Sequence, residues 1–303
     1  CRDSTEDIQV VGAYPRADFN YADVCQADFT RFTISSNIPI ATAQWNFDDG
    51  FLLPNKTLTE PIAGADLHSG ATSGTYGQPA HKFSFVSGSA NRYDVQLISR
   101  TADDVGACAD TVRRQVAILE KLTAPYIMSG IDDGSGLWIE EDRSDSTTWE
   151  FNAPVGKTGI SNTAGKVWIT NATGPYKAKD NSFVNSPCFN LSAMGKPVIS
   201  IQYWNDSDVG KDGAVLQYST DGGATWIATA PNPDKSGIVG TPTSGVNWYS
   251  NTTISSAPGG FNQFGWTGQG QIDWITGKNS LDAIPVADRD NVRFRIAFAS
   301  DER

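Results

Sequence analysis

The sequence predicts an all-β protein built from two consecutive β-sandwiches. Five segments alternate apolar and polar residues with the period of a half-buried strand, at residues 29–34, 93–98, 198–204, 215–219 and 292–298. These segments are rich in β-branched and aromatic residues and are bounded by Gly, Pro, Asn or Asp. No stretch combines a sustained 3.6-residue apolar period with helix caps. The 303 residues suggest about two domains.

Residues 111–121 (TVRRQVAILEK) admit two interpretations, a short helix or an edge strand. Their β-branched content and the Ala-Pro at 124–125 favour an edge strand that runs into a linker.

The composition disfavours several function classes. The chain has 34 acidic and 23 basic residues, so its net charge of −11 does not suit a nucleic-acid binder. No apolar run approaches the roughly 18 residues that span a bilayer. The chain has two histidines and four cysteines without a Cys–His grouping, which disfavours a zinc hydrolase and a hydrolase with a catalytic triad. No spacing of carboxylates identifies the acid and nucleophile pair of a glycosidase. We therefore expect a chain that is not an enzyme and has no organic cofactor.

A short pattern recurs at both ends of the first expected domain. Residues 1–4 (CRDS) and 108–111 (CADT) share C-x-D-[ST], and each precedes an apolar β-like segment. We interpret residues 1–13 as the last strand of a preceding repeat and residues 14–120 as the next complete copy. The sequence is then expected to be a segment of a longer chain.

Three motifs between these repeats resemble the PKD-type, Ig-like sandwich domain. Residues 45–50 (WNFDDG) resemble its W-x-F-G-D-G turn, residues 81–83 (HKF) its H-x-Y, and residues 93–97 (YDVQL) its Y-x-V-x-L strand. Asp48 departs from the usual Gly, and residues 51–80 form a longer insertion than a compact member needs, either a binding loop or an inert one. His81 belongs to the motif and is expected to be structural.

The resemblance also implies a disulfide between Cys25 and Cys108, near the first and last strands of that copy. A disulfide indicates an oxidising, extracellular compartment. By the same reasoning Cys1 would pair with a cysteine upstream of this sequence. Cys188 has no evident mate, so a buried thiol and the remnant of a lost bridge both remain open.

From residue 124 onward tryptophan becomes frequent, and the order of the motifs is similar to MAM-like or cleaved-adhesin jelly rolls. The motifs include residues 149–151 (WEF), 166–176 (KVWITNATGPY) and 292–301 (VRFRIAFASD). The resemblance implies a jelly roll over residues 124–303, cut short at its C-terminal end because the usual last strand does not follow.

Such jelly rolls stand beside PKD repeats in giant surface adhesins of gliding bacteria, which are exported by type IX secretion. The resemblance therefore implies a non-catalytic cell-surface segment that serves spacing and adhesion to surfaces or glycans. Its implied partners are neighbouring domains of the same chain, extracellular polysaccharide, and the secretion and motility machinery of the outer membrane. An accessory carbohydrate-binding region of a secreted hydrolase is the alternative.

Residues 219–226 (STDGGATW) match the Asp-box of sialidase propellers. A propeller repeats such a box at blade spacing, and this sequence has one. We therefore interpret it as a hairpin in which Asp221 accepts backbone hydrogen bonds.

Asp132 and Asp133, near the start of the jelly roll, and Asp301, near its end, form a hypothetical calcium site. First and last strands of this architecture lie side by side, and calcium favours 6–8 oxygen ligands. A solvated turn is the alternative, because neither loop has D-x-D-x-D-G spacing.

A Gly/Asn/Ser-rich stretch carries six aromatic residues that either stack on sugar rings or pack in the core. They are Trp248, Tyr249, Phe261, Phe264, Trp266 and Trp274, of which Trp248, Tyr249 and Trp266 are the candidate ligand-binding residues.

Three positions match D-[ST]-[AILVMT], a pattern that resembles an O-glycosylation signal of secreted proteins in gliding bacteria. They are Ser4, Thr111 and Ser146.

Overall fold

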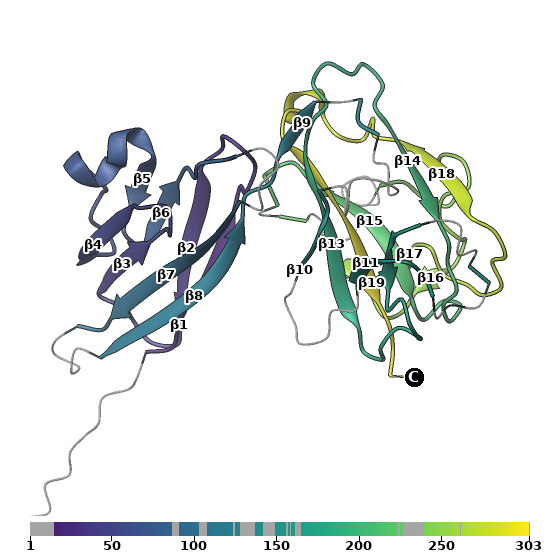
Figure 1. The fold of residues 1–303 in the computed structure, drawn as a ribbon, viewed down its shortest axis with the longest axis horizontal. Coiled ribbons are helices and arrows are strands. Elements are labelled where there is room, and N and C mark those ends of the chain that lie inside the picture. The colour runs from purple at the N-terminus through teal and green to yellow at the C-terminus, as the bar shows by residue number, and fades with distance from the viewer. Residues whose placement is uncertain are drawn as a thin grey trace, which may run out of the picture. The chain divides into compact units, whose positions relative to one another are not determined.

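A computed structural model describes most of the chain, and everything below concerns those residues. They are residues 15–86, 91–102, 108–123, 125–127, 137–141, 149–155, 157, 159–160, 165–223, 225–226, 239–260 and 262–302. The chain divides into two compact units, Cys1–Ile118 and Leu119–Arg303. Figure 1 shows strands throughout both, and helix in the described residues is confined to short 3-10 turns. The all-β prediction is confirmed.

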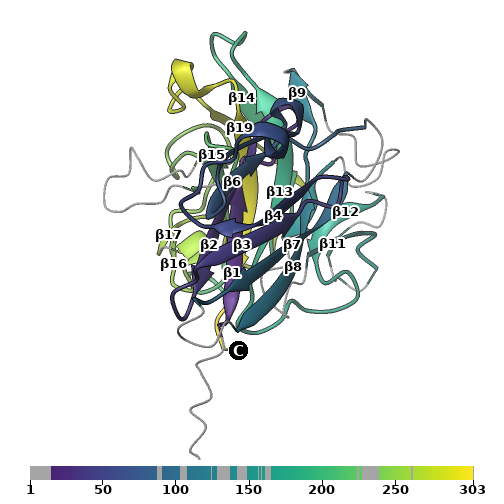
Figure 2. The same cartoon turned by 90° about the vertical axis from the view of Figure 1, so that its left-hand side faces the viewer.

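The first unit is a sandwich of two four-stranded antiparallel sheets (Figure 2). One sheet has the order β1-β2-β6-β5 and contains β1 (Ala17–Ala22), β2 (Thr30–Ser36), β6 (Gln78–His81) and β5 (Thr72–Thr75). The other has the order β4-β3-β7-β8 and contains β4 (Leu52–Thr57), β3 (Thr42–Asn46), β7 (Arg92–Arg100) and β8 (Ala109–Ala117). Of the two interpretations of residues 111–121, the edge strand is therefore confirmed.

Aromatic side chains from both sheets meet in the core of the first unit. The ring of Trp45 on β3 lies 5.2 Å from that of Phe19 on β1 and 5.4 Å from that of Phe32 on β2. The indole N–H of Trp45 donates to the carbonyl of Tyr76 at 2.9 Å. Because that indole is fully buried, its polar N–H needs this partner.

The insertion at residues 51–80 is largely part of the sandwich rather than a separate loop. It supplies β4, β5, most of β6 and the 3-10 turn η1 (Gly64–Gly70). Lys56 lies 3.2 Å from Asp66, whose carboxylate also accepts from the hydroxyl of Tyr76 at 2.6 Å. These contacts tie η1 to β4 and to the turn between β5 and β6.

The prediction of a disulfide between Cys25 and Cys108 is wrong. Cys25 takes part in a disulfide, whereas Cys108 is a thiol. Cys188 takes part in a disulfide too, so neither alternative for it, a buried thiol or the remnant of a lost bridge, is correct. The amide of Ala17 contacts Asp110 at 2.8 Å and the hydroxyl of Tyr21 contacts the carbonyl of Gln115 at 3.3 Å, so β1 and β8 run in the same direction. Cys25 follows β1 and Cys108 precedes β8, which separates them by roughly 30 Å along the strands at about 3.3 Å per residue. A disulfide needs Cα atoms within about 7 Å.

The second unit is built on a five-stranded sheet in which β10, β13, β19 and β15 follow one another and β9 pairs with β13 in parallel. These strands are β9 (Lys121–Thr123), β10 (Ile139–Glu141), β13 (Asn181–Asn190), β15 (Gly213–Ser219) and β19 (Val292–Ala299). Residues 121–123 were expected to belong to a linker. They form a strand because they pair with Cys188–Asn190, so the second unit begins at Leu119.

In the described residues of the second unit, three two-stranded ladders accompany this sheet. They are β11 (Trp149–Asn152) with β12 (Val167–Thr170), β14 (Val198–Tyr203) with β18 (Ile275–Ser280), and β16 (Thr253–Ile254) with β17 (Gln263–Phe264). The 3-10 turns η5 (Pro258–Gly260) and η6 (Val286–Asp288) lie in the connections. Ile199 and Ile201 of β14 pack against the hydrophobic core that includes residues of the large sheet, which makes a second sandwich.

The Asp-box residues form the expected turn. The hydroxyl of Ser219 donates to Asp221 at 2.6 Å, and the amide of Thr225 donates to the same carboxylate at 2.9 Å. Trp226 covers the guanidinium of Arg295, whose carbon lies 4.5 Å from the ring centroid. This contact fixes the turn against the large sheet.

No helix in the part of the chain that the structure describes has the length and apolar character to cross a membrane.

Candidate functional site

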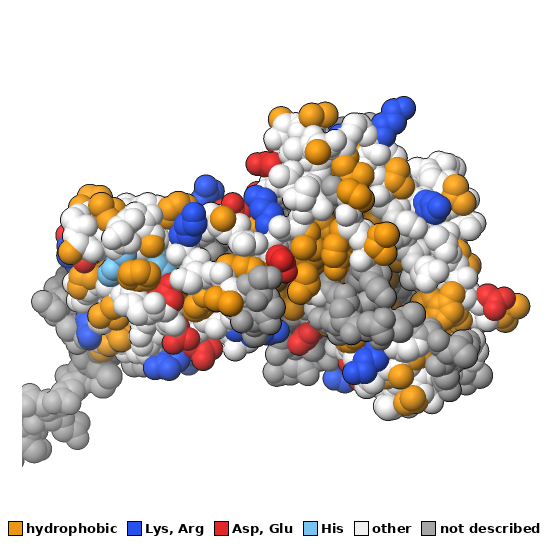
Figure 3. Space-filling view, turned by 45° about the horizontal axis from the view of Figure 1, so that its top comes forward, with side chains coloured by type: hydrophobic (Ala, Val, Ile, Leu, Met, Phe, Trp, Pro, Cys, Tyr) orange, Lys and Arg blue, Asp and Glu red, His pale blue; other side chains and the backbone are white. Residues whose placement is uncertain are grey.

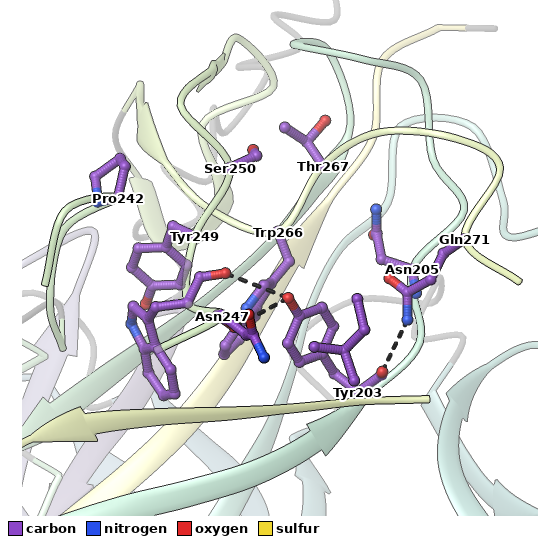
Figure 4. Close-up of a pocket in the computed structure, with 11 residues that line it drawn as sticks. Tyr203, Asn205, Pro242, Asn247, Tyr249, Ser250, Trp266, Thr267 and Gln271 are labelled. Carbon is purple, nitrogen blue, oxygen red and sulfur yellow. Dashed lines mark hydrogen bonds between the residues drawn. The ribbon is translucent and has the colours of Figure 1, made fainter. Parts of the chain in front are cut away.

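The second unit contains an open cleft of about 330 Å³ at one end of the β14–β18 ladder (Figure 4). Tyr203 closes β14 and Ile275 opens β18, and the two are register partners at that end. The remaining walls come from the segments before β16, after β17 and before β18. The lining residues are Tyr203, Asn205, Pro242, Asn247, Trp248, Tyr249, Ser250, Trp266, Thr267, Gln271 and Ile275.

The floor of the cleft is aromatic and tightly packed. Trp266 has ring centroids of Tyr203, Trp248 and Tyr249 at 5.3, 5.2 and 5.0 Å. Trp248, Tyr249 and Trp266 are only 4, 6 and 5% exposed. The core-packing interpretation therefore describes these three rings. Contact of these rings with a ligand stays a prediction. Because the rings are nearly buried, a ligand would touch their edges rather than stack on an open ring face.

Polar contacts anchor the same aromatic residues to the sandwich. The indole of Trp248 donates to the carbonyl of Val239 at 2.6 Å. The hydroxyl of Tyr249 accepts from the amide of Leu216 at 2.9 Å and faces the carbonyl of that residue at 3.3 Å. Burial raises the pKa of the Tyr249 phenol well above its ordinary value. The floor is thus a neutral, rigid surface.

Tyr203 organises the wall of the cleft. Its hydroxyl donates to the carbonyl oxygens of Asn247 and Trp248 at 3.1 and 3.3 Å. Burial raises the pKa of this phenol, so it stays protonated and keeps donating at neutral pH. Gln271 donates from Nε2 to the carbonyl of Tyr203 at 3.0 Å, which ties the segment before β18 to β14.

The cleft suits an uncharged polar ligand. None of its eleven lining residues has an ionisable acidic or basic group apart from the neutral tyrosine phenols, although the whole chain carries a net charge of −11. Amide side chains supply both hydrogen-bond donors and acceptors, and the aromatic edges below them supply apolar surface.

The sequence signals the aromatic floor but not the polar wall. Tyr203, Asn205, Asn247 and Gln271 come from three separate segments that the fold brings together. The one available signal was the Asn247-Trp248-Tyr249 run, in which a polar residue precedes two large aromatics.

The calcium hypothesis stays a prediction. Asp132 and Asp133 lie outside the described residues. The carboxylate of Asp301 lies 3.6 Å from Lys211 Nζ, and its amide donates to Asp212 at 2.7 Å. Among the residues that are described, no group of three or more His, Cys, Asp or Glu side chains is arranged to hold a metal ion.

The other sequence-based sites are only partly placed. Ser4, Ser146 and Phe261 fall outside the described ranges. Thr111 is exposed on the edge strand β8, where its O-glycosylation stays a prediction. Trp274 packs on a small satellite core of Ile160, Ile169 and Ala172 and is not among the residues that line the cleft.

His81 is buried inside the first unit rather than at a surface site. Its Nε2 lies 2.7 Å from Asp49 Oδ2, and its ring stacks on Phe47 with centroids 4.1 Å apart. This placement agrees with a structural role.

No protein-family model matches the chain, and no curated protein matches it either. A chain from a structure of manganese lipoxygenase of Gaeumannomyces graminis with a partial structure of zonadhesin of Komagataella pastoris is 10% identical. The match covers 96% of this chain and 84% of that chain with a TM-score of 0.19, which is too low to carry an argument about fold or function.

Figure 3 shows a face on which hydrophobic, acidic and basic side chains are interspersed. Lys and Arg side chains are scattered over the described part of this face.

Proposed function

We propose that this chain is a non-catalytic segment of a larger modular cell-surface adhesin. The first sandwich serves as a spacer, and the second attaches to a surface or extracellular glycan. The observation that carries the proposal is the cleft at the end of the β14–β18 ladder, lined by amides and aromatic residues and free of charged side chains. Such a site on loops of a rigid scaffold is typical of binding.

Two further observations support an extracellular setting. Cys25 takes part in a disulfide, which fits an oxidising compartment. The PKD-like and MAM-like motif order is the ground for proposing a gliding-motility adhesin, type IX secretion, and neighbouring domains of the same chain as partners.

The accessory region of a secreted hydrolase is the second candidate. The same cleft would then hold a polysaccharide for a catalytic domain elsewhere in the protein. The gene around this segment separates the two candidates, because many repeats favour the adhesin and a hydrolase domain favours the alternative.

Adhesion of the 303-residue chain, coupled to beads through a terminal tag, tests the proposal. Detachment force is measured on bare glass, on a protein-coated surface and on surfaces coated with neutral polysaccharides. Retention above that of uncoupled beads on at least one surface is expected. Beads that detach like uncoupled beads from every surface would contradict adhesion, and release of reducing sugar ends by the chain would contradict the non-catalytic assignment.

A further inference from the structure

Asn247 has a left-handed backbone conformation at the wall of the cleft. Its φ of +48° lies in the left-handed region, where residues with a Cβ are uncommon. The hydroxyl of Tyr203 fixes its carbonyl at 3.1 Å. Gly277 lies against the same carbonyl, since a Cβ at Gly277 would be 2.8 Å from that oxygen. Neighbouring residues therefore impose this conformation.

The side chain of Asn247 has hydrogen-bonding capacity left for a ligand. It is exposed, its Nδ2 makes one long contact of 3.4 Å to the carbonyl of Thr276, and its Oδ1 accepts no hydrogen bond from the described residues. By contrast, Asn205 donates to Gly268 at 2.8 Å and Gln271 donates to Tyr203 at 3.0 Å. Figure 4 shows Asn247 beside Tyr203, opposite Asn205 and Gln271.

We propose that Asn247 selects the ligand of this cleft and that the ligand is a neutral, hydroxyl-rich sugar residue. A primary amide presents an acceptor beside a donor, which matches two adjacent hydroxyl groups. The absence of charged side chains from the lining disfavours acidic sugars, and a volume of about 330 Å³ suits one sugar ring above the aromatic edges. This inference rests on the proposed function and names its ligand class.

The backbone conformation of Asn247 lets a glycine variant remove the side chain without a change in the backbone. Glycine would adopt this φ without a steric penalty. Asparagine tolerates this region better than most residues with a Cβ, so the effect of Asn247→Gly on binding reports the side-chain amide.

The test compares three variants of the whole chain on a panel of neutral disaccharides and their uronic-acid counterparts, by calorimetric titration. Asn247→Gly is expected to weaken binding of the neutral sugars about ten-fold. Asn247→Asp is expected to weaken it as well, because a carboxylate is an acceptor only. Asn171→Gly is the matched control, since Asn171 also has a left-handed φ of +56° but does not line the cleft. Its affinity is expected to equal that of the unmodified chain.

Melting temperatures separate a binding effect from misfolding. Asn247→Gly is expected to melt at or above the temperature of the unmodified chain while it loses affinity. Equal affinity in Asn247→Gly, or preference for the uronic acids, would overturn the inference and leave adhesion intact. If no sugar binds but the beads still adhere, the ligand class is wrong; if the beads do not adhere either, the proposed function fails with it.

Discussion

The buried pair of His81 and Asp49 makes a sharp prediction about the first sandwich. His81 is fully buried and the side chain of Asp49 is 4% exposed, with 2.7 Å between Nε2 and Oδ2. Among the described residues, the other hydrogen bond to this carboxylate comes from the amide of Phe51 at 3.3 Å. His81→Phe keeps a ring against Phe47 but removes the donor to Asp49.

The expected cost of His81→Phe is about 3–5 kcal/mol, because a buried carboxylate then lacks its main partner. One kcal/mol shifts the melting temperature of a domain of this size by roughly 3–6 °C, so the first unit is expected to melt at least about 10 °C lower. Trp45 is the only tryptophan before residue 119, so its indole N–H signal in NMR spectra reports the first unit. The other eight of the nine tryptophans report the second unit as an internal control.

A second variant isolates the pair. Asp49→Asn combined with His81→Phe removes the buried charge together with its partner, and it is expected to recover most of the lost stability. If His81→Phe melts within about 2 °C of the unmodified chain, or the double variant is as unstable as the sum of the two changes, the pair does not stabilise the sandwich as argued.

Three further predictions concern pH and packing. Burial alone would raise the pKa of Asp18, but hydrogen bonds from Arg114 and Phe19 and the charge of Arg114 hold that pKa below its usual value. The ionised carboxylate of Asp18 therefore stabilises the folded state above about pH 4, and this stabilisation is lost as the pH falls. Arg114→Gln should flatten the acid limb of the stability curve measured by urea unfolding, and an unchanged limb would refute the assignment. Burial raises the pKa of Asp212, so the folded state binds its proton more tightly and stability declines as the pH rises from about 4 through that raised pKa. Asp212→Asn should remove this decline from the melting curve of the second unit, and persistence of the decline would point to another group. Gly277→Ala places a methyl group 2.8 Å from the carbonyl oxygen of Asn247. Thermal unfolding should therefore show that the second unit loses about 1–3 kcal/mol of stability. An unchanged stability would mean that the wall of the cleft shifts without cost to make room for the methyl group.

Local patterns in the sequence were sufficient to identify the strands. Residues 93–98 alternate in character because one side chain in two faces a core, and the structure has β7 (Arg92–Arg100) there. Residues 292–298 also form a strand, β19 (Val292–Ala299), but nearly all of its side chains are buried, Arg293 and Arg295 included. The WNFDDG turn and His81 were expected in one domain, and the contact of Asp49 with His81 joins them across the insertion.

The cysteine pairing failed for a topological reason. Proximity of Cys25 and Cys108 to the two terminal strands suggested a bridge, but those strands run in the same direction, so one cysteine follows its strand and the other precedes it. Strand direction is set by the whole fold and leaves no trace in local sequence.

The sequence predicts the aromatic residues of the cleft but not its polar residues. Large aromatics in a polar stretch signalled a special region, yet burial of Trp248 and Trp266 depends on long-range packing that the sequence does not reveal. The polar residues Asn205 and Gln271 are ordinary loop residues in sequence, and only the pairing of β14 with β18 brings them together.

A titration of the isotope-labelled whole chain with neutral disaccharides, followed by backbone and side-chain NMR shifts, tests the central claim most directly. Binding in the cleft predicts that saturable shifts are confined to residues 203–205, 242–250 and 266–275, with the side-chain amide of Asn247 among the largest. Saturable shifts that leave Asn247 unmoved, or that cluster in residues 15–118, would contradict it.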